Sequence, residues 1–264
     1  MVAIGGVGGS GTRVVAEILN ELGYFIGNDL NESNDNLLFT LLFKRQNILT
    51  LTDSEFDIIL NIFLKIMSKD DSLTVKELNK INELASNDRT LHNKEWLTLR
   101  TKYLENNKKQ NLWGWKEPNS HIVMEKLLNK IDNLKFIYVY RNGLDMAYSS
   151  NQNQLKLWGS IFFNQYNIEI NHKNSLKYWC MVHKKMLNLQ SVYKDRILML
   201  DFDELCLNPE EILFNIGTFI GNNKDIIRLK KLIKIPNTIG RYKEYRLDDF
   251  AEEDLKFIST IYNI

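Results

Sequence analysis

The sequence predicts an α/β fold, a doubly wound parallel sheet with a helical insertion. A short apolar run over 2–4 enters a glycine-rich loop, and the loop leads directly into residues with helical periodicity. Two more apolar runs, 136–140 and 197–200, suit buried parallel strands. Because strands that alternate with helices are typical of a doubly wound sheet, these observations favour that architecture.

The remaining elements follow from periodicity. Helical spacing over 12–22 and a short apolar run over 24–26 predict a helix and a second strand, which would complete a βαβ unit. From about 37 to 109 the periodicity is helical with polar faces, which indicates a helical insertion that either shapes an acceptor pocket or simply packs over the sheet. Further helices are expected at 120–130 and 210–219.

Composition limits the possible classes of protein. The 264 residues are 44% hydrophobic and 25% charged, as in an ordinary globular protein, and no long repeat or proline-rich linker divides them. We therefore expect one domain over 1–264, with its insertion at about 37–109. The formal net charge of +1 gives no global attraction to nucleic acid or anionic lipid, so any anion site must be local.

Targeting signals and cysteines point to a cytoplasmic protein. Residues 1–4 run at once into glycines, without the basic and apolar regions of a signal peptide. Every apolar run is well short of the ~20 residues that span a bilayer. The two cysteines, Cys180 and Cys206, are too few for a disulfide framework or a zinc cluster.

The first candidate site is the loop at 5–13, GGVGGSGTR, between a strand and a helix. Glycines let the backbone approach a phosphate, and the free N–H groups at the start of the helix bind the anion. Gly6, Gly8 and Gly11 have the spacing of a dinucleotide site, and Asp29 lies near the position of a ribose-binding acid, so an oxidoreductase remains possible.

The same loop also fits a second template in part. Gly6 and Gly11 have the Walker A spacing, but Thr12 and Arg13 stand where Lys and Ser or Thr are required. An ordinary ATP or GTP hydrolase is therefore disfavoured. A tight strand-to-helix turn that binds nothing is the remaining alternative.

The second candidate site follows the strand at 136–140. Arg141 stands at the carboxyl end of this strand, and Ser149 comes eight residues later, one or two turns into the following helix. Two such residues can converge on a single phosphate. The alternative is an Arg141–Asp145 salt bridge with a surface serine.

The third candidate site is the segment WGWKEP at 113–118. Lys116 lies between large apolar residues and ahead of Pro118, which forces Glu117 out of the helical region. This lysine is well placed to carry positive charge into a dry pocket. The alternative is a lysine that only lays its stem along two core tryptophans.

Together these segments resemble the ordered motifs of a known family. The loop at 9–12, Arg141 with Ser149, and the later LDFDELCLNP at 200–209 are similar to motifs of the sulfotransferase family, and the match is scattered from about 5 to 241. The resemblance implies a P-loop-like α/β fold. It also implies 3′-phosphoadenosine 5′-phosphosulfate (PAPS) as the donor of the sulfuryl group.

The resemblance implies a role for each matched residue. Arg141 and Ser149 would bind the 3′-phosphate, which ATP and NAD lack. Lys116 lies in a Lys-Glu-Pro element similar to a Lys-Asp-Pro element of protein-tyrosine and related sulfotransferases, in which the lysine faces the sulfuryl group. Arg241, within Gly-Arg-Tyr, would correspond to the late basic-glycine element over the 3′-phosphate. The donor's 5′-phosphosulfate would lie on Gly9, Ser10, Gly11, Thr12 and Arg13.

One position departs from the family pattern. Many members have Lys or Arg just before Ser-Gly-Thr, and this chain has Gly9 there. The cation for the leaving phosphate must then come from Arg13 or Lys116, or the protein is a weak or inactive relative.

Sulfuryl transfer should follow the logic of phosphoryl transfer, in which positioning and cations do most of the work. Lys116 would stabilise the sulfuryl group and the leaving oxygen, helped by Arg13 and the loop N–H groups. Glu32 and Asp35 are candidate bases for the acceptor hydroxyl, with Asp29 as a third. The four histidines show no metal spacing, so no metal is expected.

The sequence therefore predicts a sulfotransferase that moves a sulfuryl group from PAPS to a hydroxyl of a carbohydrate or small-molecule acceptor. Two alternatives remain open. One is a P-loop protein that binds a nucleotide without sulfotransferase activity. The other is a dinucleotide-dependent oxidoreductase, which would leave Arg141 and Ser149 unexplained.

Overall fold

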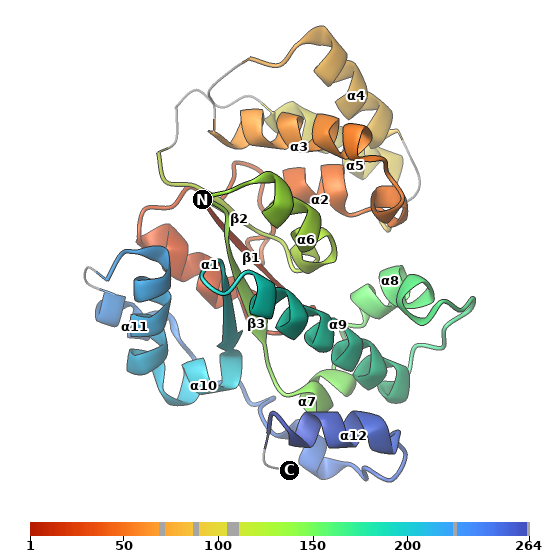
Figure 1. The fold of residues 1–264 in the computed structure, drawn as a ribbon, viewed down its shortest axis with the longest axis vertical. Helices are drawn as coiled ribbons and strands as arrows, with labels where there is room; N and C mark the ends of the chain where they lie inside the picture. Colours follow the sequence, from red (N-terminus) through yellow and green to blue (C-terminus); the bar gives the residue numbers. More distant parts are fainter. Residues whose placement is uncertain (69–71, 87–89, 105–110, 224–225, 263–264) are drawn as a thin grey trace.

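A computed structural model of the chain describes residues 1–68, 72–86, 90–104, 111–223 and 226–262. Among these residues, four parallel strands form one sheet in the order β2-β1-β3-β4 (Figure 1). The strands expected at 136–140 and 197–200 are confirmed. The strands are β1 (Val2–Gly6), β2 (Gly114–Lys116), β3 (Lys135–Tyr140) and β4 (Ile197–Asp201).

The strand order places the candidate loops at one edge. Strands β1 and β3 are neighbours; the chain leaves β1 toward β2 on one side of this pair and leaves β3 toward β4 on the other side. In an open parallel sheet, ligands bind at the carboxyl ends of the strands where the order reverses in this way. The glycine loop follows β1 and Arg141 follows β3, so both stand at this position.

Helices cover both faces of the sheet. On one face, Ile4 and Val139 pack in a cluster with side chains of α1, α10 and α11. On the other face, Ala3 and Tyr138 pack with α6, α8 and α9. The doubly wound α/β class predicted from the sequence is therefore confirmed. These helices are α1 (Thr12–Glu21), α6 (Ser120–Lys130), α8 (Asn153–Phe163), α9 (His172–Val192), α10 (Phe202–Leu207) and α11 (Pro209–Ile220).

Helical structure also occupies the described part of the segment expected to be an insertion; residues 69–71, 87–89 and 105–109 lie outside the described residues. The helices gather at one end of the molecule, at the top of Figure 1. They are α2 (Leu37–Phe43), α3 (Asp53–Ser68), α4 (Val75–Ala85) and α5 (Lys94–Arg100), with short 3-10 turns η1 (Gln46–Leu49) and η2 (Thr101–Tyr103).

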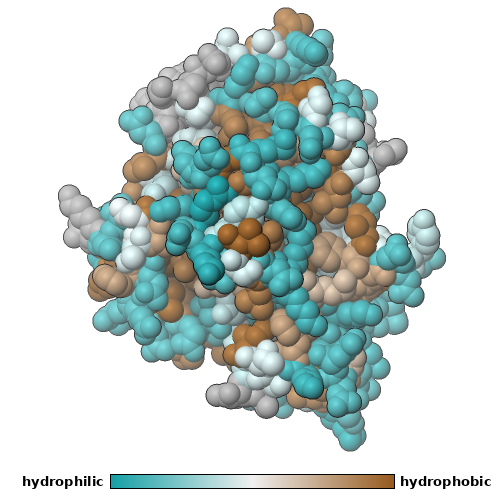
Figure 2. Space-filling model, in the orientation of Figure 1, coloured by the Kyte–Doolittle hydropathy of each residue, from teal (hydrophilic) through white to brown (hydrophobic). Residues whose placement is uncertain are grey.

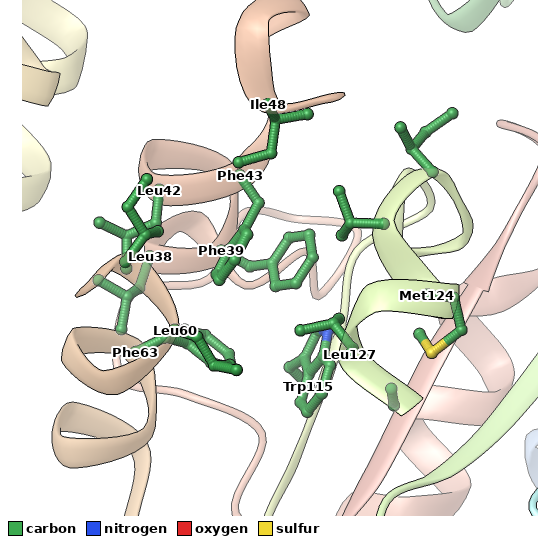
Figure 3. Packing of buried hydrophobic residues seen from close by; sticks show 14 of the residues in the cluster. Leu38, Phe39, Leu42, Phe43, Ile48, Leu60, Phe63, Trp115, Met124 and Leu127 are labelled. Atoms are coloured by element: carbon green, nitrogen blue, oxygen red, sulfur yellow. The ribbon is translucent and has the colours of Figure 1, made fainter. Parts of the chain in front are cut away.

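Aromatic packing joins this helical segment to the sheet. Every residue of α2 is buried. Phe39 of α2 stacks on Trp115 of β2 with ring centroids 5.7 Å apart, and Phe63 of α3 meets Trp115 edge-on at 5.2 Å (Figure 3). Because such large buried rings fix one another's orientation, they fix how α2 lies against the end of β2.

The rest of the chain packs near the carboxyl edge of the sheet. Helix α7 (Gly143–Ala147) contacts α9, and α12 (Glu252–Ser259) packs on α9 as well. Two 3-10 segments, η3 (Ile226–Leu232) and η4 (Arg241–Glu244), connect α11 to α12. None of the helices in the described part of the chain combines the length and hydropathy that a bilayer-spanning helix needs. The face in Figure 2 is largely hydrophilic, with apolar side chains in scattered patches.

The second strand was predicted in the wrong place. Residues 24–26 do not form a strand; Phe25 makes a single parallel bridge to Trp113, and Gly27 follows at φ 128°. The strand that lies beside β1 is β2, from a segment that periodicity did not identify because only Gly114–Lys116 are extended. A strand this short is too brief to show a period of two.

Candidate functional site

The first part of the site is the loop between β1 and α1. Gly11 is the N-cap of α1 at φ 90°, no side chain caps the helix, and its first turn contains no acid. The first N–H groups of α1 are therefore without a side-chain acceptor, and the helix dipole favours an anion there.

Packing fixes the shape of this loop. A Cβ added to Gly11 would lie 2.1 Å from Cδ2 of Phe202, so only glycine fits against α10. Gly9 also has a positive φ, 94°. The Ser10 hydroxyl is fully buried and has no hydrogen-bond partner within the described part of the chain. A buried, unsatisfied hydroxyl in a glycine cradle suits a bound phosphate or sulfate oxygen.

The second part of the site is Arg141. Its side chain is 5% exposed, and its Nη1 donates a hydrogen bond to Oγ1 of Thr238 at 3.1 Å. Asp145 and Asp203 stand 3.7 and 3.5 Å from its Nη2 and Nε, too far or too poorly aligned for hydrogen bonds. Among the described residues, Nε and Nη2 have no hydrogen-bond partner. A buried guanidinium with two unused donors can accept a phosphate in a bidentate manner.

The two carboxylates near Arg141 are themselves buried. Burial raises the pKa of Asp203, and the charge of Arg141 opposes that rise. Oδ2 of Asp203 accepts a hydrogen bond from the N–H of Asn142 at 3.3 Å. The Arg141–Asp145 salt bridge that was the alternative interpretation is present as a long contact, and it leaves donors of Arg141 unused.

Asp145 brings the C-terminal segment to this arginine. Its Oδ2 accepts a hydrogen bond from the N–H of Gly240 at 2.7 Å, and its Oδ1 accepts one from the N–H of Tyr242 at 3.0 Å. Between them, Arg241 donates from Nη1 to the carbonyl of Tyr148 at 3.2 Å. Arg241 thus lies beside the turn that carries Ser149.

Ser149 lies outside the helix in which it was expected. Helix α7 ends at Ala147. The side-chain amide of Gln152 donates hydrogen bonds to the carbonyls of Met146 and Ser149, and these bonds stabilise a turn where the helix would otherwise continue. The Oγ of Ser149 lies 3.7 Å from the position of a Cβ on Gly9. The structure therefore brings the serine of the second motif to the glycine loop of the first.

The third part of the site is Lys116, the last residue of β2. It is 2% exposed, and its Nζ donates to the carbonyl of Ser33 at 2.9 Å and forms an ion pair with Asp35. Burial lowers the pKa of Lys116; the Asp35 carboxylate opposes this, and the charge of Arg13 adds to it. Lys116 is therefore a buried cation in contact with a candidate base.

Arg13 reaches the same turn from α1. Its Nη2 donates to Oγ of Ser33 at 2.8 Å, while Lys116 donates to the carbonyl of that residue. The side chain of Arg13 is exposed and approaches from the solvent side. Two cations from different elements therefore meet at one serine.

The three candidate bases differ in their surroundings. Asp35 contacts Lys116 and also accepts a hydrogen bond from the side chain of Asn31 at 2.8 Å. Glu32 is exposed on the same turn. Asp29 pairs with Nη1 of Arg100 at 3.0 Å, and burial raises its pKa. Of the three acids, Asp35 is the one that the structure places on Lys116.

Several residues at this edge were not identified from the sequence. Asp145 was expected only as a salt-bridge partner of Arg141, and Asp203 lay within a motif in which no role was assigned to it. Thr238 and Lys44 carried no signal, because their partners are distant in the chain and no local spacing marks them.

Solved structures similar to this chain include sulfotransferases. The sulfotransferase domain of the Synechococcus PCC 7002 olefin synthase is 14% identical with a TM-score of 0.52, over 100% of this chain and 94% of that one. The sulfotransferase of Alicyclobacillus acidocaldarius is 12% identical with a TM-score of 0.48, over 98% and 94%. Sulfotransferase STF9 of Mycobacterium avium is 12% identical with a TM-score of 0.47, over 99% and 75%. At 14% identity, the likeness to the olefin synthase domain shows the fold alone.

The parallel sheet, with a glycine loop and a buried arginine at its carboxyl edge, defines an α/β protein of the P-loop-like class. The sulfotransferase domain family matches residues 2–241, so this chain belongs to the sulfotransferase family, whose enzymes use PAPS as donor. Comparison with curated protein sequences gives no match. Membership of this family decides against the dinucleotide-dependent oxidoreductase.

Proposed function

We propose that this sulfotransferase transfers the sulfuryl group of PAPS to a hydroxyl of a carbohydrate or another small-molecule acceptor. One observation supports this above the others. Arg141 and Ser149 are eight residues apart, and Arg241 joins them from a distant part of the chain, beside the glycine loop. A nucleotide with a phosphate on both the 3′ and the 5′ position of its ribose needs two anion sites, and ATP or NAD would use only one of them.

The donor would lie along the carboxyl edge of the sheet. The loop at 9–13 and the N-terminus of α1 would bind the 5′-phosphosulfate, with the unsatisfied Ser10 hydroxyl as a donor. The unused N–H groups of Arg141 would bind the 3′-phosphate together with Ser149 and Arg241. When bound, PAPS supplies an activated sulfuryl group on a good leaving phosphate.

Lys116 would stabilise the group in transfer. Negative charge develops on the bridging and equatorial oxygens in a loose, in-line transition state, and a preorganised cation in a dry site is most effective there. Burial keeps water away from Lys116. Arg13, which meets Lys116 at Ser33, would supply the charge that Gly9 lacks.

Asp35 is the proposed general base for the acceptor hydroxyl. Its carboxylate contacts Lys116, so a hydroxyl that accepts the sulfuryl group beside Lys116 would also lie within reach of Asp35. Removal of the proton during attack would leave Asp35 neutral and Lys116 free for the sulfuryl oxygens. Glu32, exposed on the same turn, is the second candidate.

The helical segment that follows this turn would form the acceptor wall. Asp29 pairs with Arg100 of α5, and the Arg100 guanidinium stacks over the Trp96 ring at 4.8 Å. His92 stacks on the same ring with centroids 3.8 Å apart. Aromatic rings beside a charged pair suit a ring with several hydroxyl groups, such as a sugar.

The test begins with binding. Calorimetry with adenosine 3′,5′-bisphosphate (PAP), ATP and NAD should show preference for the bisphosphate in the wild type and its loss in Arg141→Ala. Transfer of labelled sulfuryl from PAPS would then be screened against sugars and phenols. Indifference to the bisphosphate would overturn the donor site. A Lys116→Met variant that binds PAPS but has lost turnover separates an enzyme from a protein that only binds the nucleotide.

A further inference from the structure

The acid that follows Lys116 in the chain is the most deeply buried carboxylate near the site. Glu117 is 0% exposed. Its Oε2 accepts a hydrogen bond from the N–H of Asn119 at 2.5 Å, and its Oε1 accepts one from Nδ2 of Asn119 at 3.0 Å. Since side chains alternate along extended backbone, Glu117 faces away from the contact that Lys116 makes with Asp35.

Lys44 neutralises this buried charge. Its Nζ lies 3.0 Å from Oε1 of Glu117, and its side chain is 18% exposed. Burial alone would lower the pKa of Lys44, but the charge of Glu117 and the hydrogen bond to it outweigh burial, so the pKa is raised; Asp35 contributes in the same direction. Lys44 and Glu117 therefore form a persistent ion pair one residue from Lys116.

A single helix connects both sides of the Lys116–Glu117 dipeptide. Asn36 caps the start of α2, and its backbone N–H donates to the carbonyl of Lys116 at 2.6 Å. Lys44 stands at the other end of α2 and reaches Glu117. The helix thus holds the backbone of Lys116 at its first turn and the side chain of Glu117 at its last.

We propose that Lys44 and Glu117 are positioning residues, whose ion pair keeps Lys116 directed toward the sulfuryl group; this rests on the proposed function. A buried carboxylate without a partner is costly and attracts the nearest ammonium. Without Lys44, the ammonium of the adjacent residue Lys116 is available to Glu117, whose charge already acts on it. Lys116 would then turn away from Asp35 and from the sulfuryl site.

The proposal predicts the effect of three variants. Lys44→Met should lower kcat by about 10- to 100-fold, the usual effect of losing a residue that orients a functional group. The double variant Lys44→Met with Glu117→Gln should recover most of that loss, because it leaves no buried charge to attract Lys116. Lys44→Arg should keep most of the activity.

Binding gives a readout that does not depend on turnover. The ratio of the PAPS and PAP dissociation constants reports contacts to the sulfuryl group alone, so Lys44→Met should reduce the preference for PAPS while PAP binding stays unchanged. Lys65→Met with Glu77→Gln is the matched control, since it removes an ion pair of 2.8 Å that joins α3 and α4 away from the site. Circular dichroism and urea unfolding verify that each variant is folded.

The outcomes separate the two proposals. A folded Lys44→Met that behaves like the Lys65 control, or a folded double variant that recovers nothing, would overturn the positioning role. A wild type that binds neither PAPS nor PAP would instead contradict the proposed function. A double variant that recovers the PAPS preference would support the role even where the acceptor is a poor one.

Discussion

Asp145 accepts a hydrogen bond from the backbone N–H of Gly240 at 2.7 Å, a contact between residues 95 positions apart in the chain. This contact fixes Arg241 next to the turn that carries Ser149. It also keeps one oxygen of Asp145 engaged, so that the nearby guanidinium of Arg141 is not fully paired. One buried carboxylate thus holds the C-terminal segment beside Arg141 and leaves two donors of that arginine unused among the described residues.

Replacement of Arg141 should weaken PAP binding. Loss of a charge-assisted, bidentate contact typically costs about 2–3 kcal/mol, so Arg141→Ala should raise the PAP dissociation constant by roughly 30- to 150-fold. Isothermal calorimetry measures this directly. Arg246→Ala is the control, because the Arg246 side chain is 90% exposed and forms a surface ion pair with Asp248. Equal affinity in both variants would exclude Arg141 from the donor site.

Two glycine replacements separate strain from close packing. Gly11 and Gly23 have similar positive φ values, 90° and 85°, but a Cβ on Gly23 meets nothing within 4 Å. Gly23→Ala should therefore lower the free energy of unfolding only by the penalty of a left-handed backbone for alanine, about 1–2 kcal/mol. Gly11→Ala adds the clash with Phe202, so urea unfolding should show a clearly larger loss of folding free energy than for Gly23→Ala. Gly11→Ala should also lose PAP binding. Similar costs for the two variants would show that the loop can move aside.

The two acids on the turn after residue 30 should differ in their effect on rate. Asp35→Asn should reduce kcat by about 10²- to 10⁴-fold, the contribution of a general base, and should leave PAP binding intact. Glu32→Gln, an exposed residue on the same turn, is the matched control and should keep the wild-type rate. The opposite result in steady-state kinetics would assign the base to Glu32.

The buried His121 should make stability depend on pH. It is 1% exposed, its Nδ1–H donates to the carbonyl of Pro118 at 2.8 Å, and burial lowers its pKa to about 4. Since the unfolded pKa is about 6.5, the unfolded state takes up the proton first as the pH falls. The contribution of neutral His121 to the free energy of unfolding is therefore fully present above pH ~6.5. It decreases as the pH falls toward ~4, by at most about 1.4 kcal/mol per pH unit.

Urea unfolding at pH 7.5 and pH 5.5 tests this expectation. His121→Asn keeps an N–H donor for Pro118 but does not titrate, so its loss of stability between the two pH values should be smaller than that of the wild type. The comparison isolates His121 from Asp201, whose pKa burial raises to about 6 and whose effect has the opposite sign. If stability falls equally with pH in the two proteins, His121 takes up its proton as readily in the folded state as in the unfolded state, which would contradict the expectation.

Much of the fold was predictable because its signals are local. The runs that became β3 and β4 are continuous and apolar, and α6 spans the residues expected to be helical, 120–130. The glycine loop was predictable from its composition, because five of the residues at 5–11 are glycine. The end of α7 was not predictable, because the amide of Gln152, beyond the helix, terminates it.

The sequence by itself determined the fold class, the family resemblance, and the three segments that meet at the carboxyl edge of the sheet, since each depends on residues within a few positions of one another. Only the tertiary structure decided which side chains meet there. Asp35 on Lys116, Lys44 on Glu117 and Asp145 on Gly240 are contacts across long stretches of chain. Such pairings depend on strand order and on how α2 packs on Trp115, and no local spacing of residues encodes them.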